Sequence, residues 1–324
     1  MKRSRCALRA LFLSCCLLPG TLLAQAYPAR PVIMVVPFAA GGPVDAMARV
    51  VGPKMSEGLG QPVVIENRAG ASGFVGMASV AHAAPDGYTV LYTPISLAIG
   101  PALYRKLPFD AEKDLAAVSQ TVATTLVLAA HPKTGVQSVK DLVARAKAQP
   151  GKLNFGSSGV ADPLQLGMEL LKTSAGIDML AIPYKGQGPM FQALLAGEVD
   201  VAVVSMQSAL SQFKGGRLVP LAVTAKRRSS ALPDVATVEE LGYPGFEMPS
   251  WHGIFAPAAT PRDVVTRLQR EAARAVQSNE VRQRVESTGN EVVGSTPEEF
   301  EAKYRADVAR FKKIVKDAGL PYQD

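Results

Sequence analysis

This sequence of 324 residues contains only three cysteines, and all of them, Cys6, Cys15 and Cys16, stand before residue 27. From residue 27 onward the chain therefore has no thiol that could form a disulfide or bind a metal ion. Without disulfides the fold must be stabilised by its hydrophobic core. The about 300 residues that remain are enough for two domains of ordinary size.

Histidine is equally scarce, and its three copies, His82, His131 and His252, are far apart and show no metal-ligand spacing. We expect a structural role for each. The segment Gly156–Gly159 encloses two serines, whereas a nucleophile elbow needs one residue on each side of a single serine. The segment Gly186–Gly188 lacks the third glycine of a dinucleotide-binding loop. The sequence therefore predicts no catalytic residue, no metal site and no cofactor, which disfavours an exported hydrolase.

A large excess of charge of one sign is also missing once the first 26 residues are set aside. The formal charge of +7 includes four basic residues and no acidic residue before residue 27, so the rest of the chain carries about +3. No cluster of lysine and arginine alternates with aromatic side chains, and we predict no nucleic-acid partner. The small positive excess is compatible with a small anionic ligand.

The first 26 residues have the features of a secretory signal peptide. Four basic residues precede the mostly apolar run Ala10–Leu18, and Ala24–Ala26 is a small-x-small cleavage site, so we expect the mature chain to start at Tyr27. The apolar run is too short to span a bilayer. Lipidation at Cys15 or Cys16 is the weaker alternative, because both lie early in the apolar run.

The segment Val32–Arg49 organises the rest of the chain. Val32–Val36 is a short, apolar, β-branched run typical of a strand that is buried on both faces. Small residues follow in the loop, Pro43 suits the first turn of a helix, and Asp45 can cap that turn. A strand, a loop of small residues that leaves the backbone accessible, and a helix N-terminus direct several N–H groups at one small volume. This arrangement favours the binding of an anion. The alternative is an ordinary turn between a strand and a helix that binds no ligand, and from this segment alone the two interpretations have equal weight.

Strand and helix patterns then alternate along the chain, which predicts two α/β halves with parallel sheets covered by helices, followed by a helical tail. The predicted strands are Val32–Val36, Val63–Glu66, Thr89–Thr93, Leu126–Ala130, Leu153–Phe155, Met179–Pro183, Val199–Val204 and Val219–Thr224. The predicted helices are Pro43–Leu59, Gly73–Ala83, Val139–Ala148, Pro163–Thr173, Pro189–Ala196, Gln207–Phe213, Pro261–Ser278, Glu280–Ser287 and Pro297–Ala318.

Polar turns follow several strands of the second half. Ser157 and Ser158 come after one strand, Tyr184–Gly186 after the next, and Ser205 after a third. Taken singly, each is better explained as a solvated loop or a capping group. Ligands of open α/β sheets lie beyond the carboxyl ends of the strands, so together these turns favour a binding cleft.

Many blocks of the chain, in order, resemble the periplasmic solute-binding proteins of tripartite tricarboxylate transporters, the Bug or TctC type. The resemblance runs from Tyr27 to the C-terminus. The matching blocks are YPARPVIMVVPFAAGGPVDAMAR, GQPVVIENRAGASG, APDGYTVLY, PALYRKLPFD, PGKLNFGSSG, PYKGQGPMFQALLAGEVD, LAVTAKRRSSALPDVATVEELGYPGFE and SWHGIFAPAATP.

This resemblance implies a fold of the type II periplasmic binding protein class, a Venus flytrap of two α/β domains joined by two crossing segments. We expect residues 27–123 and 248–324 to form the first domain and residues 124–247 the second, with 1–26 removed as the signal peptide. We place the crossings near Thr121–Leu126 and Phe246–Phe255, where Pro249, Gly253 and Pro257 would absorb the hinge rotation.

The resemblance also implies a ligand-binding site between the domains. The loop after the first strand would hold one carboxylate, partly through ordered water, and hydroxyl groups from both domains would complete the site, with a tryptophan by the return crossing. The residues concerned are Pro37, Phe38, Ala39, Ala40, Gly41, Gly42, Asp45, Thr93, Ser96, Ser157, Ser158, Ser205 and Trp251.

Departures from the family pattern affect the expected ligand. The usual loop has two prolines and a small polar residue where Ala39, Ala40 and Val44 stand here. The second-domain turn also departs from the family pattern, at Ala161, Asp162, Pro163 and Gln165. After the fourth strand of that domain, Val204 and Ser205 replace an Asp-Asn pair that the family often has. These changes predict a cleft that favours an aromatic or apolar carboxylate over citrate.

The function implied is capture of a small organic carboxylate in the periplasm by a monomer, followed by delivery to TctA/TctB-like membrane permease subunits. An alternative is a ligand-sensing accessory protein for a chemoreceptor or two-component system, which would use the same domain closure to signal.

Overall fold

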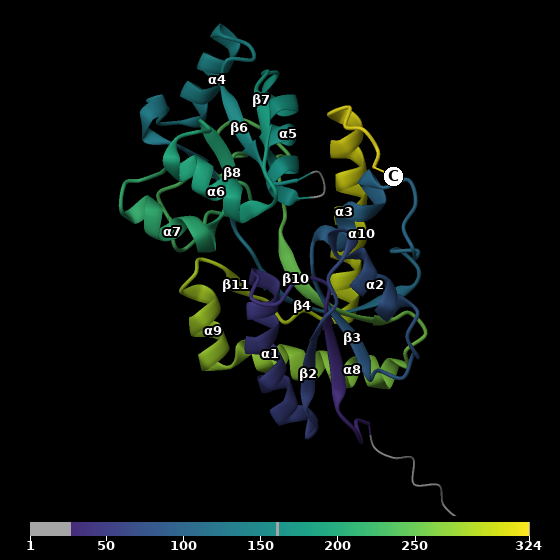
Figure 1. Ribbon diagram of the computed structural model, residues 1–324. Helices are drawn as coiled ribbons and strands as arrows, with labels where there is room; N and C mark the ends of the chain where they lie inside the picture. The colour runs from purple at the N-terminus through teal and green to yellow at the C-terminus, as the bar shows by residue number, and fades with distance from the viewer. Residues whose placement is uncertain (1–26, 160–161, 324) are drawn as a thin grey trace, which may run out of the picture.

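A computed structural model describes residues 27–159 and 162–323. Two lobes, each built from one β-sheet and its covering helices, lie one above the other (Figure 1). The predicted signal peptide, residues 1–26, lies outside the described residues.

The first domain contains a six-stranded sheet in the order β11-β4-β10-β3-β1-β2. Its strands are β1 (Val32–Val36), β2 (Val63–Asn67), β3 (Thr89–Pro94), β4 (Leu115–Ala123), β10 (Trp251–Pro257) and β11 (Glu291–Val292). Its helices are α1 (Pro43–Leu59), α2 (Phe74–Ala81), α3 (Ser96–Leu103), α8 (Arg262–Gln277), α9 (Asn279–Glu286) and α10 (Pro297–Asp317).

The second domain contains a five-stranded sheet in the order β7-β6-β8-β5-β9. Its strands are β5 (Leu126–Ala130), β6 (Asn154–Ser157), β7 (Leu180–Pro183), β8 (Val201–Ser205) and β9 (Val219–Val223). Its helices are α4 (Val139–Ala148), α5 (Pro163–Ala175), α6 (Gln187–Ala196) and α7 (Met206–Lys214).

Both sheets are mixed, so the prediction of parallel sheets was wrong for the strands next to the crossings. β10 pairs antiparallel with β3 and β4, and β5 pairs antiparallel with β8 and β9. The chain that leaves one domain has to return to it, and the returning strand fits between strands that run the other way. The sequence patterns do not predict β4, β10, β11 or α3.

Strand direction places the two expected halves of the site opposite each other. β4 runs toward the second domain, and β1 and β3 run the same way as β4, because each pairing in the sheet fixes the relative direction. β5 runs away from the first domain, so β6 and β8, which run against it, end facing the first domain. The carboxyl ends of β1, β3, β6 and β8 therefore all point at the gap between the domains.

The two crossings run side by side and are hydrogen-bonded to each other. The Thr124 amide donates to the Ser250 carbonyl at 3.0 Å, and the two side-chain oxygens are 2.5 Å apart. The return crossing is shorter than predicted, because β10 already begins at Trp251. Gly253 lies inside β10 and not in a hinge: a Cβ atom there would approach Phe300 Cζ to 2.2 Å, so this glycine allows close packing.

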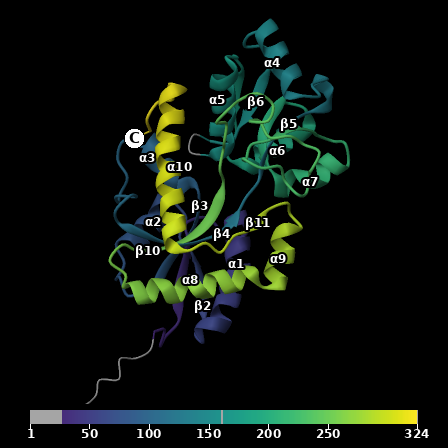
Figure 2. The same ribbon diagram turned by 180° about the vertical axis from the view of Figure 1, so that it is seen from behind.

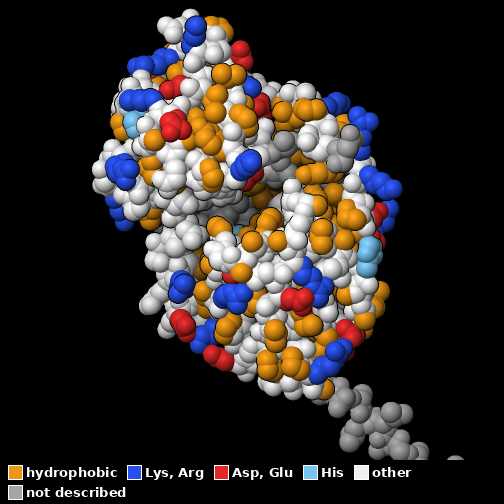
Figure 3. Space-filling view, in the orientation of Figure 1, with side chains coloured by type: hydrophobic (Ala, Val, Ile, Leu, Met, Phe, Trp, Pro, Cys, Tyr) orange, Lys and Arg blue, Asp and Glu red, His pale blue; other side chains and the backbone are white. Residues whose placement is uncertain are grey.

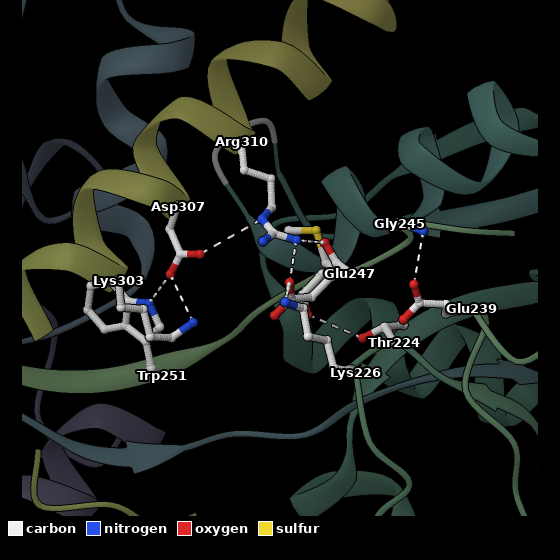
Figure 4. A network of polar contacts seen from close by, with 10 residues as sticks. Thr224, Lys226, Glu239, Gly245, Glu247, Trp251, Lys303, Asp307 and Arg310 are labelled. Carbon is white, nitrogen blue, oxygen red and sulfur yellow. Dashed lines mark hydrogen bonds and ion pairs between the residues drawn. The ribbon is translucent and has the colours of Figure 1, made fainter. Parts of the chain in front are cut away.

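Helix α10 lies along the return crossing and runs up beside the second domain (Figure 2). The Trp251 indole Nε1 donates to Asp307 Oδ2 at 2.9 Å, and Lys303 pairs with the same carboxylate at 3.3 Å (Figure 4). One turn further, Arg310 forms an ion pair with Glu247 at 2.6 Å. One helix therefore holds both ends of the crossing.

Among the described residues, we find no helix that is both long enough and apolar enough to cross a membrane.

The first prediction concerns Asp307, which is 1% exposed. Replacing it with leucine leaves the buried Trp251 indole N–H without an acceptor, and we expect the free energy of unfolding to fall by about 3 kcal/mol. Asp307→Asn keeps an acceptor and should cost no more than about 1 kcal/mol. Urea unfolding of the mature protein measures both. Equal losses in the two variants would contradict a role for the indole hydrogen bond.

Candidate functional site

The space-filling view shows a hollow between the two domains, with hydrophobic side chains along its rim (Figure 3). The carboxyl ends of strands from both sheets point at this hollow. Each predicted site residue lies in a loop, at a strand end or in the first turn of a helix at this edge, and Trp251 is the first residue of β10. The structure thus brings the two predicted halves of the site to the same gap.

Asp45 fixes the shape of the loop Pro37–Gly42. Its side chain is buried in the first turn of α1, where Oδ2 accepts hydrogen bonds from the Gly41 amide at 2.8 Å and Arg49 Nε at 2.9 Å. Oδ1 accepts from Asn67 Nδ2 at 2.9 Å, and the same Asn67 nitrogen donates to the Phe38 carbonyl. Both carboxylate oxygens thus accept hydrogen bonds from the protein, and the predicted contact of Asp45 with a ligand stays a prediction.

The groups around Asp45 keep its carboxylate ionised over the whole physiological pH range. The hydrogen bond from Arg49, followed by those from Gly41 and Asn67, lowers its pKa to about 2 despite burial. An ionised carboxylate repels a ligand carboxylate, so we infer that the loop attracts an anion through its backbone and that Asp45 holds the backbone in place.

Four backbone amides of this loop have no hydrogen-bond partner in the described part of the chain: those of Phe38, Ala39, Ala40 and Gly42. The loop leads into α1, a helix of 17 residues whose positive end lies here. Ala39 and Ala40 are exposed, and Pro37 is buried beneath them. Free N–H groups at a helix N-terminus form an anion-binding site.

The first domain adds Thr93, at the end of β3, and Ser96, the first residue of α3. Thr93 is fully buried. Ser96 is 9% exposed, and its Oγ has no hydrogen-bond partner among the described residues. An unpaired buried hydroxyl is unfavourable for folding, so a ligand or water at this point would satisfy it.

The second domain contributes three serines. Ser157 Oγ donates to Gln165 Oε1 at 2.9 Å, and the side-chain oxygens of Ser205 and Ser208 are 2.9 Å apart. Ser158 is buried beside the Asp162 carboxylate but forms no hydrogen bond of ordinary geometry. Asp162 caps α5, and burial raises its pKa.

Two residues of the predicted second-domain turn, at positions 160 and 161, lie outside the described residues. The predicted effect of Ala161 on the ligand is therefore not addressed by the structure.

Trp251 is completely buried against Phe255 and Phe300, with its nitrogen bonded to Asp307. It lies by the return crossing, as expected, and its side chain fills the core on the side of α10. Its contact with a ligand stays a prediction.

The sequence patterns do not identify Arg49, Asn67 and Gln165 as the partners that hold these groups, and they leave open whether His252 is buried. Arg49 is four residues after Asp45, a spacing that could have indicated an i,i+4 pair. Asn67 and Gln165 come from other elements and carry no such signal. His252 stands between Trp251 and Gly253 in a block that we had assigned to a hinge, and its burial follows only from the position of β10.

The described residues contain no cluster of three or more His, Cys, Asp or Glu side chains suited to a metal ion. A separate hollow of about 450 Å³ lies by Tyr104, Asp110, Glu112 and Lys312 on the outside of the first domain. It has no strand end or unpaired buried group at its surface, and we assign it no function.

Comparison with known proteins identifies the class of the molecule. A family model for the tripartite tricarboxylate transporter family receptor, TctC, matches residues 47–320. The structure is similar to Rpa4515 of R. palustris with adipate, at 32% identity and a TM-score of 0.81, covering 92% of this chain and 100% of that one.

Two further structures are similar over most of their length. Periplasmic binding protein BugD is 33% identical with a TM-score of 0.79, covering 92% of this chain and 100% of that one. MatC (Rpa3494) from Rhodopseudomonas palustris with bound malate is 31% identical with a TM-score of 0.77, covering 89% and 100%.

The second prediction uses the buried imidazole of His252, whose pKa is lowered by burial to about 4. In the unfolded chain this ring takes up a proton near pH 6.5, whereas in the folded protein it stays neutral until about pH 4. The folded state therefore loses stability as the pH falls from 6.5 toward 4. Between pH 7 and pH 5 we expect this group to lower the free energy of unfolding by about 2 kcal/mol.

The variant His252→Gln has no titratable group at this position. Between pH 7 and pH 5 its free energy of unfolding should therefore fall by about 2 kcal/mol less than that of the wild type. Urea unfolding in buffers without carboxylates measures the difference. Identical pH dependence in the two proteins would show that the ring is protonated in the folded state.

Proposed function

This chain belongs to the tripartite tricarboxylate transporter family of receptors, and from that membership we propose that it captures a small organic carboxylate between its two domains. The domains correspond to residues 27–123 with 248–324 and to residues 124–247. The membership of β1–β4, β10 and β11 in one sheet and β5–β9 in the other supports this division.

The observation that supports carboxylate binding best is the set of unpaired polar groups at the gap. The free amides of Ala39, Ala40 and Gly42 lie at the positive end of α1, and Ser96, whose hydroxyl has no partner, is the first residue of α3. No group in the described residues accepts a hydrogen bond from these donors. Each donor follows a strand that points at the other domain and holds it in position.

The proposed ligand site is the set predicted from the resemblance: Pro37, Phe38, Ala39, Ala40, Gly41, Gly42, Asp45, Thr93, Ser96, Ser157, Ser158 and Ser205. Within it we give Asp45 the role of positioning the loop. We assign the remaining predicted residue, Trp251, a role in supporting the return crossing, because its indole N–H donates to Asp307.

We propose a ligand with a carboxylate at one end and an apolar body. The exposed methyl groups of Ala39 and Ala40 border the loop and offer no hydrogen bond to a ligand hydroxyl. Two similar proteins have been seen with dicarboxylates, Rpa4515 with adipate and MatC with malate. Adipate has only methylene groups between its carboxylates, so it represents the class that we favour here over hydroxylated acids.

Membership of the receptor family favours delivery of the ligand to a transporter over the sensing alternative. We propose TctA/TctB-like membrane permease subunits as the partners and a monomer as the working form. We assign no catalytic residue, metal or cofactor, since the site is explained by binding alone.

We place the protein in the periplasm, as expected for this family of periplasmic binding proteins.

The third prediction is that export removes residues 1–26. Mass spectrometry of the periplasmic protein should find Tyr27 at the N-terminus, because Ala24–Ala26 has the small residues that signal peptidase requires. A mature chain that begins with a lipidated Cys15 or Cys16 would contradict this cleavage site.

The fourth prediction tests the anion site. A thermal-shift panel of linear, hydroxylated and aromatic carboxylates should contain at least one acid that raises the melting temperature of the mature protein. For the best acid, Gly42→Val should weaken binding by about 2 kcal/mol, because the side chain covers the free amides.

Gly42 has a φ of −75°, and a Cβ atom would lie 3.5 Å from its nearest neighbour, the Ala39 carbonyl, so this variant should fold. Circular dichroism checks the fold, and Gly60→Asn, at the far end of α1, serves as the control that should bind normally, because asparagine tolerates the left-handed φ of 71° at this position. Full affinity in a folded Gly42→Val protein would refute the loop as the anion site.

A further inference from the structure

The imidazole of His252 is a buried polar side chain that neither the fold nor the proposed site uses. It is 8% exposed, and its Nδ1 atom is buried without a hydrogen-bond partner. No side chain of the described residues forms a hydrogen bond with either ring nitrogen. Buried polar groups in native proteins are nearly always paired, so an orphan of this kind calls for a partner from outside the chain.

His252 lies at the edge of the first sheet that faces the second domain. It is the second residue of β10, which begins immediately after the return crossing, and it pairs with Pro94 at the end of β3. Ser96, whose Oγ is also buried without a partner, follows Pro94 by two residues, and the Ile95 amide donates to the Trp251 carbonyl at 3.1 Å. The two unpaired groups therefore belong to the same strand ends.

The ring is held in a fixed position. Tyr92 packs edge-on against it, with ring centroids 5.9 Å apart and an angle of 75° between the ring planes. The Tyr92 hydroxyl is 3.1 Å from Thr121 Oγ1, which donates to the His252 carbonyl at 3.0 Å. Tyr92 thus holds the ring and Thr121 the backbone, as is typical of a binding group that is organised before its ligand arrives.

The protonation state limits what the ring can bind. Burial lowers the pKa of His252 to about 4, so at neutral pH the imidazole is uncharged, with one N–H donor and one acceptor. A carboxylate oxygen accepts only, and it can pair with the N–H of the neutral ring.

The sheet order separates His252 from the loop Pro37–Gly42. β10 carries the histidine, β1 leads into the loop, and β3 lies between them. Neighbouring strands are about 4.8 Å apart, so the two groups lie roughly 10 Å apart across the sheet before the reach of the side chains is counted. A single carboxylate cannot contact both, whereas an acid with oxygen atoms at its two ends can.

We propose that His252 contacts the ligand: its imidazole donates a hydrogen bond to the second carboxylate of a linear dicarboxylic acid whose first carboxylate is bound by the loop Pro37–Gly42. This inference rests on the proposed function and adds the residue that distinguishes dicarboxylates from monocarboxylates. Ser96, on the strand end between the two groups, is placed to bind the same second carboxylate.

The experiment is isothermal titration of the mature protein with succinate, adipate and suberate and with the monocarboxylates of equal length, butanoate, hexanoate and octanoate. The wild type should bind one of the dicarboxylates at least about tenfold more tightly than its monocarboxylate partner, the effect of one hydrogen bond to a charged group. His252→Phe should lose that preference and leave monocarboxylate binding within about twofold. His252→Asn, which keeps a donor near the position of Nδ1, should restore part of it.

The control is His82→Phe, because His82 follows the C-terminus of α2, at the end of the domain where β3 begins and away from the gap. It should bind every acid as the wild type does. A thermal melt of each variant at pH 7 verifies that it is folded.

Each outcome decides between the hypotheses. Equal affinity of wild type and folded His252→Phe for the dicarboxylates overturns the role of His252 and leaves the proposed function intact. An equal loss for dicarboxylates and monocarboxylates overturns it too, since it would show general damage to the site. If no acid of the series, and none of the wider panel described above, binds the wild type, the proposed function itself fails, and this inference with it.

Discussion

The double crossing between the domains is the constraint on which the rest of the structure depends. Because β4 leads out of the first sheet and β10 returns into it, β1 and β3 end facing the second domain, and β6 and β8 end facing the first. The crossings are tied to each other through Thr124 and Ser250, and to α10 through Trp251 and Glu247. A site made from four strand ends thus follows from chain direction, and its two halves can approach or separate only where the crossings bend.

Hydrogen bonding divides the polar residues at the gap into two groups. Asp45 accepts hydrogen bonds from Gly41, Arg49 and Asn67 on its two oxygens, and it keeps the first loop in shape. The amides of that loop, Ser96 and His252 have no partner, although they are held just as firmly. Since leaving a buried polar group unpaired is unfavourable, the buried and unpaired Ser96 hydroxyl and His252 ring at one edge indicate that stability has been given up for binding. The unpaired groups therefore identify the ligand surface better than the charged ones do.

The sequence predicted the parts of the fold that local pattern determines. The strand Val32–Val36, its loop and the helix Pro43–Leu59 occur as expected, because a β-branched run, small residues and an early proline are each sufficient signals. β4 was missed because Ser119, Gln120 and Thr121 interrupt its apolar pattern, yet they are buried by β10 and the segment that follows α9. β10 was missed because its proline and glycine indicate a loop. Gly253 leaves space for the Phe300 ring, which a side chain at this position would contact too closely. The partners of Asp45 and the burial of His252 depend on contacts between distant elements, and no local pattern contains them.

Closure of the two domains over the ligand is the central claim, because donors on opposite sides of the gap can act on one small acid only if the domains come together. Small-angle X-ray scattering of the mature protein, with and without a saturating concentration of the acid that binds best, tests it most directly. The account predicts a smaller radius of gyration in the complex than in the free protein. An unchanged scattering curve at saturation, with binding verified by calorimetry on the same sample, would contradict it.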